Sequence, residues 1–306
     1  MNTDSYFGGV LLDYPTLSQR IGSTCALALL LEVAATPKPG LVDRLTNGAH
    51  TDMDFSTFLA STTAIAPYFA FCARQGLSLP APPDQTTLSR IRPQGVLCEG
   101  EMLAATGGVN THKGAIFSMG ILACAAGACA ARGDLSPEAV CAAAAVIAAP
   151  AAEDFARPVP PEQTTTGRIL YRSRGITGIR GEAASGFASA RQWALPVLEE
   201  FSGRSYPEND VHLHALLHLM ANVCDTNILA RGGPEGLDYL HASAKEVLAL
   251  GGALTPAGKA RLGKLDGEFT RRGLSPGGCA DLLSVAILLH RLPALIPPGE
   301  EGNAHG

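Results

Sequence analysis

Residues 115–131 form a run without a charged side chain, AIFSMGILACAAGACAA, and this run constrains the fold more than any other segment. Such a run must be shielded from water, either by the rest of the protein or by a lipid bilayer. A membrane-spanning helix needs about 20 strongly apolar residues, whereas this run is shorter and rich in Ala, Gly and Cys. We therefore expect a helix buried inside a globular protein, with no membrane contact.

The rest of the chain predicts further helices and no convincing strand. No run of β-branched residues alternates with polar residues between hairpin turns, whereas apolar segments with helix caps recur. Asp54 is a predicted N-cap, and so is Ser136, which precedes Pro137. We predict helices at 16–35, 54–76, about 93–105, 115–131, 136–149, 182–200, 208–224, 235–250, 257–271 and 279–291. Residues 1–306 are thus predicted to form one all-α domain of ten or more helices, with a long surface loop at 156–167.

The composition excludes several classes of protein. Hydrophobic residues make up 46% of the 306 residues and charged residues only 17%, which is typical of a globular chain and not of a disordered one. The net charge of −5 argues against a general nucleic-acid binder, which usually carries a basic face. The eight cysteines form no CxxC pair and mostly stand among apolar residues, as reduced core cysteines do. Because no signal peptide is evident at the N-terminus, we expect a cytoplasmic protein.

The densest polar cluster, GGVNTHKGAIFSMG at 107–120, stands at the start of the uncharged run. Helix N-termini expose unpaired N–H groups and bind anions. Asn110 and Thr111 are placed to cap this helix, and Lys113 is placed to add a positive charge. The segment is not a Walker A loop, because it lacks the glycine before the lysine and the Ser or Thr after it. An ordinary capped helix start is the alternative interpretation.

Lysine usage favours a phosphate site. Only five of the 23 basic residues are lysines, and two of them, Lys38 and Lys113, lie in turns rich in Gly or Pro. Four further segments also place polar residues beside glycine at a predicted helix end. They are PKPGLVDRLTNGAHTDMD, RSRGITGIRGEA, CDTNILARGGPEG and SPGGCADLL. Each alone can be a solvated turn, but five such segments in one domain predict glycine-rich loops that converge on one cleft.

The residue types in these segments indicate the kind of ligand. Carboxylates and amides dominate, and no Cys/His spacing suits zinc. Oxygen ligands suit Mg²⁺, which proteins usually hold through one or two carboxylates together with substrate phosphates. Glu99, Asp225 and Asp281 are the predicted ligands. The three histidines of HLHALLH at 212–218 lack a metal-binding motif, and we interpret them as helix-face residues. The residues themselves thus predict a polyphosphate site with Mg²⁺ and leave the reaction open.

The same segments, in the same order, resemble the triphosphoribosyl-dephospho-coenzyme A synthase family. The resemblance covers about 32–285 and includes EGEMLAATGGVNTHKGAIFSMG, TGIRGEAASGF and DTNILARGG. One position departs from the family pattern, because Cys279 stands where the family usually has a small hydroxyl residue. The resemblance implies an enzyme that transfers the triphosphoribosyl group of ATP to the 2′-hydroxyl of 3′-dephospho-coenzyme A and releases adenine. The product then passes to a separate transferase, which attaches it to the acyl carrier protein of citrate lyase or malonate decarboxylase.

This reaction implies roles for individual residues. A carboxylate accepts the proton of the attacking hydroxyl, and we predict Glu99 for this role, with Asp225 and Glu182 as alternatives. His112 or Asn110 would donate to the leaving adenine. The predicted substrate-binding residues are Lys38, Asp43, Arg44, Asn110, Thr111, Lys113, Arg180, Asn227 and Arg231.

Two other functions remain open at this stage. A phosphoryl or nucleotidyl transferase would use the same Mg²⁺-ATP pocket and yield ADP or AMP in place of adenine. A coenzyme A or nucleotide binding module without catalysis would bind both ligands and yield no product. The motifs slightly favour the citrate lyase branch over the malonate decarboxylase branch.

Overall fold

The computed structural model describes residues 16–153, 169, 171–172 and 175–296 of the protein. Every regular element in these ranges is helical, which confirms the predicted all-α class. The elements are α1 Leu17–Ala34, α2 Phe55–Leu77, α3 Leu88–Ala105, α4 Lys113–Ala130, α5 Pro137–Glu153, α7 Gly178–Ala184, η2 Ala190–Ala194, α8 Leu195–Phe201, α9 Glu208–Asn222, α10 Thr226–Ala249, η3 Gly252–Leu254, α11 Pro256–Arg272, α12 Gly277–Arg291 and η4 Leu292–Leu295. The predicted surface loop at 156–167 lies outside the described residues.

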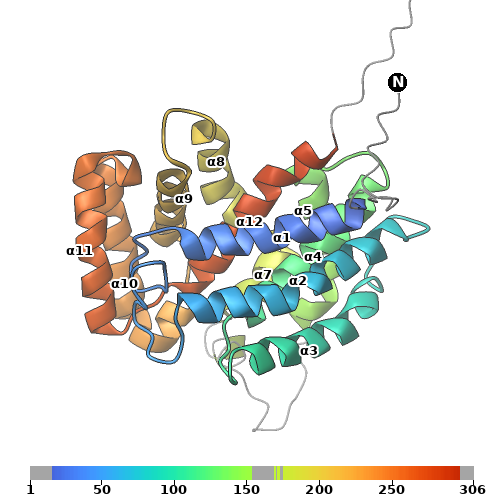
Figure 1. Cartoon of the computed structure of the whole chain (residues 1–306), viewed down its shortest axis with the longest axis horizontal. Coiled ribbons are helices and arrows are strands. Elements are labelled where there is room, and N and C mark those ends of the chain that lie inside the picture. The colour runs from blue at the N-terminus through green and yellow to red at the C-terminus, as the bar shows by residue number, and fades with distance from the viewer. Residues whose placement is uncertain (1–15, 154–168, 170, 173–174, 297–306) are drawn as a thin grey trace, which may run out of the picture.

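Helix α4, the uncharged run, lies at the centre of one helical group and packs against α1, α2, α3, α5 and α12 (Figure 1). Its small residues allow this crowding. A Cβ atom on Gly127 would lie 2.1 Å from the carbonyl oxygen of Ala73 in α2, so the two backbones meet where only glycine fits. The predicted buried helix is confirmed.

By length and composition alone, three helical segments are long and apolar enough to cross a membrane: Phe55–Leu77, Lys113–Ala130 and Gly277–Leu295.

The predicted caps are confirmed. Asp54 accepts a hydrogen bond from the Thr57 amide in a capping box at the start of α2. The Ser136 hydroxyl accepts one from the Ala139 amide at the start of α5, where Pro137 is the first helical residue. These caps use hydrogen bonds between close neighbours in the chain, which is why the sequence predicts them well.

Three helix boundaries differ from the prediction. Helix α3 begins at Leu88 rather than near 93, because its extra turn buries Leu88 in the core. The predicted helix 182–200 is three elements, since Gly186 and Phe187 have positive φ and interrupt it. Helix α10 joins two helical segments across a kink at Gly233, whose backbone is not helical. The predicted start at 235 matches the second segment, and the prediction lacks the first segment, which begins at Thr226.

A second helical group contains α9, α10, α11 and α12, and Figure 1 shows α10 and α11 at the side of the molecule away from α3 and α5. The loop between α1 and α2 joins this group to the first one. The Asp266 carboxylate of α11 holds that loop, accepting hydrogen bonds from the Gly40 amide and the Thr46 hydroxyl. The loop is thereby fixed against α11.

Seven of the eight cysteines are buried and all eight are free thiols, as the sequence predicts for core cysteines. Burial raises the pKa of the seven buried thiols, that of Cys98 to about 12. Only Cys224 is exposed.

Candidate active site

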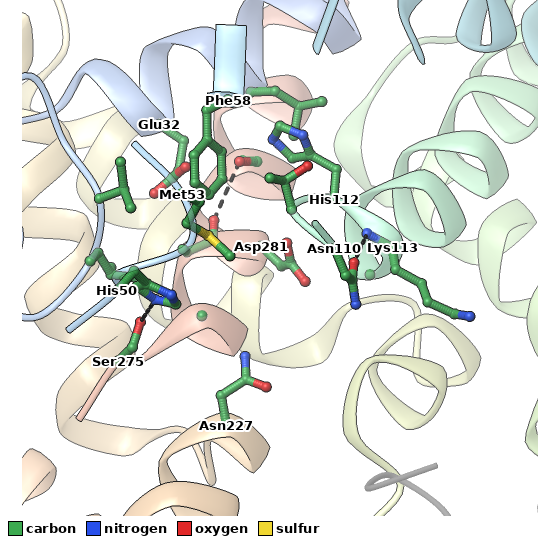
Figure 2. Close-up of a pocket in the computed structure, with 18 of the residues that line it drawn as sticks. Glu32, His50, Met53, Phe58, Asn110, His112, Lys113, Asn227, Ser275 and Asp281 are labelled. Atoms are coloured by element: carbon green, nitrogen blue, oxygen red, sulfur yellow. Dashed lines mark hydrogen bonds between the residues drawn. The ribbon is translucent and has the colours of Figure 1, made fainter. Parts of the chain in front are cut away.

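A cavity of about 390 Å³ lies where the two helical groups meet. Its walls come from the end of α1, the loop between α1 and α2, the start of α4, the start of α10 and the start of α12. Eight of the predicted site residues line it: Lys38, Asn110, Thr111, His112, Lys113, Asn227, Arg231 and Asp281. They come from four of the five glycine-edged segments. The predicted convergence on one cleft therefore holds for those four, and Figure 2 shows the side chains around the Asp281 carboxyl group.

Two helix N-termini open on this cavity, those of α4 and α12. The N-cap residue of α4 is His112, not the predicted Asn110 or Thr111, and it makes no side-chain cap bond. The Asn110 side chain accepts a hydrogen bond from the Lys113 amide, whereas the Thr111 hydroxyl turns to Ser61. The Gly114 and Ala115 amides that follow have no hydrogen-bond partner among the described residues. Free amides at the positive end of a helix dipole are a ready anion site.

Gly114 makes room for a carboxylate at this helix start. A Cβ atom at this position would lie 2.3 Å from Oδ2 of Asp281, so any other residue would displace the Asp281 side chain. No described residue donates a hydrogen bond to this carboxyl group. Its burial, together with the negative charges of Glu32 and Asp225, raises the pKa of Asp281 to about 8. The Asp281 carboxyl group thus has oxygens that can accept a hydrogen bond, and no described residue donates one to them.

A buried ion pair forms part of the cavity wall. Lys38 Nζ lies 2.5 Å from Glu32 Oε1, and the two side chains are only 2% and 7% exposed. The second oxygen of Glu32 has no hydrogen-bond partner among the described residues. This oxygen keeps some accessible surface, and because Glu32 lines the cavity, it is open to the cavity. A lysine and a carboxylate are therefore both fixed beside the two helix N-termini.

Further cationic and polar groups complete the opposite wall. Arg231 donates to the backbone oxygens of Ala49 and Gly273, which anchors its guanidinium beside His50. His50 Nε2 lies 2.9 Å from the Ser275 hydroxyl (Figure 2). Burial, and next the Arg231 charge, lower the pKa of His50, so this ring is neutral near pH 7.

Lys113 is less buried than Lys38, because its side chain is 55% exposed. Its ammonium group lies 2.8 Å from Glu99 Oε2, and Figure 2 shows the side chain extending away from Asp281. Glu99 itself lines a different cavity of about 270 Å³, together with Arg180 and Phe117. The Lys113–Glu99 pair therefore connects the two cavities.

Two predicted substrate-binding residues hold the loop instead of lining the cavity. The Asp43 carboxylate accepts hydrogen bonds from the Lys38, Leu45 and Thr46 amides. Arg44 donates from Nε to the Ala34 carbonyl and from Nη2 to Asn209. Their contribution is to fix the backbone that presents Lys38.

Asp225 has both carboxylate oxygens occupied. Oδ1 accepts hydrogen bonds from the Asn227 and Ile228 amides and caps α10, and Oδ2 accepts one from the Cys279 amide of α12. Burial raises the pKa of Asp225, although these donors favour its charged form. Asp225 thus joins the starts of α10 and α12 and places Asn227 at the cavity.

Glu182 lies in a third cavity, of about 410 Å³, formed by α7 and the starts of α10 and α12. Its carboxylate accepts hydrogen bonds from the amide and the hydroxyl of Ser189. The structure therefore does not bring Glu182 or Arg180 into the main cavity.

Glu99, Asp225 and Asp281 do not form one cluster. Across the described part of the chain, no group of three or more His, Cys, Asp or Glu side chains is close enough to hold a metal ion. The histidines of α9 agree with their interpretation as helix-face residues, since His212 and His214 are buried against neighbouring helices. Of the three predicted metal ligands, only Asp281 lines the main cavity.

Sequence reasoning missed several residues of the cavity, of which Glu32 and Phe58 are the main ones, and it gave no role to His50, which lies in one of the glycine-edged segments. Glu32 left a signal, because it continues the buried stripe of α1 formed by Cys25, Ala28 and Leu29. A carboxylate on the core-facing side of a helix needs a buried partner or a function. Phe58 left no comparable signal, since an aromatic residue in an apolar helix is usually a core residue.

Comparisons with known proteins identify the family. The sequence model described as CitG, ATP:dephospho-CoA triphosphoribosyl transferase, matches residues 18–298. A 2-(5''-triphosphoribosyl)-3'-dephosphocoenzyme-A synthase of Pectobacterium atrosepticum is 42% identical over 277 residues, which cover 89% of each chain. A protein of the same name from Klebsiella pneumoniae is 40% identical over 281 residues, which cover 92% of this chain and 93% of that relative. No solved structure matches. The chain belongs to the ATP:dephospho-CoA triphosphoribosyl transferase family.

Proposed function

We propose that the main cavity is the active site of a 2-(5''-triphosphoribosyl)-3'-dephospho-coenzyme A synthase. The enzyme breaks the bond between adenine and the ribose of ATP and joins that ribose carbon to the 2′-hydroxyl of 3′-dephospho-CoA. Adenine leaves, and the triphosphate stays on the product. One observation supports this most strongly: four separate family segments place two helix N-termini, a buried lysine and two carboxylates around a single cavity.

The triphosphate fits the cationic side of the cavity. We propose that the free amides of α4, Lys113 and Arg231 bind it, with Lys38 behind them. Lys113 is exposed and, among the described residues, paired only with Glu99, so it can turn toward an incoming phosphate at little cost. Positive charges fixed on the phosphates hold the ribose carbon in place against the attacking hydroxyl, which supplies the entropic part of catalysis.

The donor set also suits Mg²⁺. Asp281 offers a partly buried carboxylate without a protein donor, and the Asn227 amide lies on the same wall. Mg²⁺ needs few protein ligands when substrate phosphates supply the others. We propose Asp281 as the protein ligand. When bound, the ion would neutralise phosphate charge. Asp225 supports this site indirectly, because its oxygens already accept backbone hydrogen bonds.

Glu32 is the carboxylate in the cavity that best fits the role of proton acceptor. Lys38 holds one of its oxygens, and the other is open to the cavity. Carboxylates near the reacting carbon also stabilise the oxocarbenium character that develops when a glycosidic bond breaks. Glu99 stays a second proposal for this role, because its bond to Lys113 places it at the boundary of the cavity.

The adenine leaving group fits the apolar wall formed by Phe58, Met53 and Leu29. His112 and Asn110 line the same cavity and are the proposed hydrogen-bond donors to its ring. The neighbouring cavity, with Phe117 and Arg180, is the proposed entry of dephospho-CoA, whose pantetheine arm is largely apolar and whose diphosphate is anionic.

We also propose the cellular context. ATP and dephospho-CoA are cytoplasmic metabolites, so we place the protein in the cytoplasm, without a membrane or a nucleic acid as partner. A separate transferase would take up the product for the acyl carrier protein of citrate lyase or malonate decarboxylase.

The decisive experiment is product analysis. The protein is incubated with ATP, dephospho-CoA and Mg²⁺, and the products are separated by chromatography and mass spectrometry. Adenine in equal amount to a dephospho-CoA adduct heavier by a triphosphoribosyl group supports the proposal. ADP or AMP in place of adenine would indicate a phosphoryl or nucleotidyl transferase. Bound ligands without product would indicate a binding module.

A further inference from the structure

His112 belongs to a short chain of hydrogen bonds that links three helices. It is the N-cap residue of α4 and is only 4% exposed. Its Nδ1 atom lies 2.7 Å from the hydroxyl of Ser61, a fully buried residue of α2. The Thr111 hydroxyl lies 2.6 Å from the same Ser61 oxygen and donates to it. The backbone amide of His112 contacts the Met102 sulfur of α3.

The surroundings of the Ser61 hydroxyl favour one direction for its bond to His112. Thr111 donates to the Ser61 oxygen. If Nδ1 of His112 also donated to that oxygen, the buried O–H group of Ser61 would have no acceptor among the described residues, which costs free energy. If Ser61 donates to Nδ1, both polar groups are satisfied, and the single N–H group of the neutral imidazole is then on Nε2.

Nε2 is the atom that reaches the cavity. It has no hydrogen-bond partner among the described residues. His112 as a whole is buried, but its Nε2 atom keeps some accessible surface. The ring also packs edge-on against Phe58, at a centroid distance of 5.0 Å and an interplanar angle of 86°. The ring orientation is therefore set by one hydrogen bond and one aromatic contact, with a free donor at its open end.

We propose that Ser61 and Thr111 are positioning residues that hold His112 as its Nε2–H tautomer, a neutral hydrogen-bond donor aimed at the leaving adenine. The choice of adenine as acceptor rests on the proposed function. The tautomer and its cause rest on the hydrogen bonds alone. Ser61 lies in none of the glycine-edged segments.

The electrostatic surroundings agree with a neutral ring. Burial, and next the charge of Lys38, lower the pKa of His112 to about 3. The ammonium of Lys38 is the charge that acts on this ring. The other charged or titratable groups around the same cavity are Glu32, His50, Asp52, Lys113, Arg231 and Asp281. A ring that stays neutral can donate a hydrogen bond at any physiological pH, whereas a general acid would have to be protonated first.

The chemical step balances without protonation of His112. The bond between the ribose carbon and adenine breaks, and its electron pair goes to the adenine ring. The dephospho-CoA oxygen forms the new bond to that carbon, and its proton passes to a carboxylate. The Nε2–H group stabilises the negative charge on adenine while it develops, and adenine then takes up one proton from solvent. A hydrogen bond that strengthens as charge develops lowers the barrier.

NMR on the full-length protein with ¹⁵N-labelled histidine tests the tautomer without an activity assay. The His112→Gln variant identifies the resonances. We expect Nδ1 of His112 to show the shift of an unprotonated nitrogen and Nε2 that of an N–H group, both unchanged between pH 5 and 8. An Nδ1–H tautomer, or a titration of His112 near pH 6.5, would overturn the proposal even if the enzyme releases adenine.

Matched variants test the positioning role. Thr111→Val removes the donor while it keeps the side-chain shape, and Thr111→Ser keeps the hydroxyl. Ser61→Ala removes the bridge, and Ser118→Ala is its control, because Ser118 is equally buried and bonds only within its own helix. We expect Ser61→Ala and Thr111→Val to give a mixture of tautomers and to lower kcat about 10–100-fold with KM for ATP nearly unchanged. Thr111→Ser should restore the Nε2–H tautomer that Thr111→Val disturbs, and Ser118→Ala should behave as wild type.

The results separate this proposal from the assigned reaction. If Ser61→Ala keeps the Nε2–H tautomer and the wild-type kcat, the positioning role is wrong and the synthase assignment stands. If the wild-type protein releases no adenine, the synthase assignment fails, and the NMR result alone decides whether Ser61 and Thr111 hold the tautomer.

Discussion

The buried Lys38–Glu32 pair gives the sharpest test of the cavity. Both side chains are almost fully buried, at 2% and 7% exposure, and their charged atoms are 2.5 Å apart. Glu32→Gln leaves the ammonium group buried without a negative partner, and Lys38→Met leaves the carboxylate in the same state. Removing one member of a buried pair costs about 3–5 kcal/mol, whereas replacing both by neutral groups is often close to neutral. We therefore expect each single variant to lose about 3–5 kcal/mol and the double variant to lose much less than their sum.

Urea unfolding at pH 7 measures this coupling. The wild type, both single variants and the double variant form a double-mutant cycle, and equal m-values confirm that the unfolding transition is comparable in all four. The exposed pair of Arg204 and Glu200, with both side chains at 57% exposure, is a matched control. Its cycle should give less than about 1 kcal/mol. A coupling for Lys38 and Glu32 as small as that of the surface pair would refute the reasoning.

The same variants separate two roles of Glu32. If Glu32 accepts the proton of the attacking hydroxyl, Glu32→Gln lowers kcat about 10²–10⁴-fold, while KM for ATP changes little. If Glu32 only holds Lys38 against the phosphates, Glu32→Gln and Lys38→Met both raise KM for ATP. Stopped assays of adenine release at several ATP concentrations distinguish the two outcomes.

Three further predictions follow from single sites. Lys113→Ala should abolish adenine release and change the free energy of unfolding by less than about 1 kcal/mol, because its only ion pair is partly exposed; near-normal turnover would remove Lys113 from the site. Gly114→Ala should lower activity, because its Cβ would displace the Asp281 side chain. Gly263→Ala is the control: its Cβ would enter open space, so turnover should stay unchanged and stability should rise by up to about 1 kcal/mol. Equal behaviour of the two variants in activity assays and urea unfolding would contradict this. Burial lowers the pKa of His214 to about 4. Protonation of this ring therefore favours the unfolded state, and the free energy of unfolding falls as pH drops from about 6.5 to 4. Urea unfolding of His214→Leu should show a smaller loss of stability between pH 7 and 5, and an unchanged loss would refute this.

Local chemistry explains what the sequence predicts well. The caps at Asp54 and Ser136 bond to amides three residues away, and the Asn110 side chain accepts from the amide three residues after it, just before α4. The uncharged run 115–131 has to be buried wherever the chain places it. The glycine-edged segments end or begin helices, and their polar groups point to one kind of ligand.

The roles of individual carboxylates are less predictable. Asp43, Asp225 and Asp281 look alike in the sequence, since each lies in a glycine-edged segment. Asp43 and Asp225 accept backbone amides with both oxygens, whereas Asp281 has no donor among the described residues and faces the cavity. A carboxylate becomes structural or reactive according to which donors reach it, and the donors to Asp225 include the amide of Cys279, 54 residues away.

By itself, the sequence determined the helical class, the burial of the central helix, the family and four of the segments that surround the cavity, because caps, apolar runs and motifs depend on neighbours in the chain. Only the tertiary structure decided that Glu32 pairs with Lys38, that Glu182 lies in another cavity, and that Ser61 reaches the ring of His112. These contacts depend on how whole helices pack. That packing is set by the fit of many side chains at once, and no single segment of the chain records it.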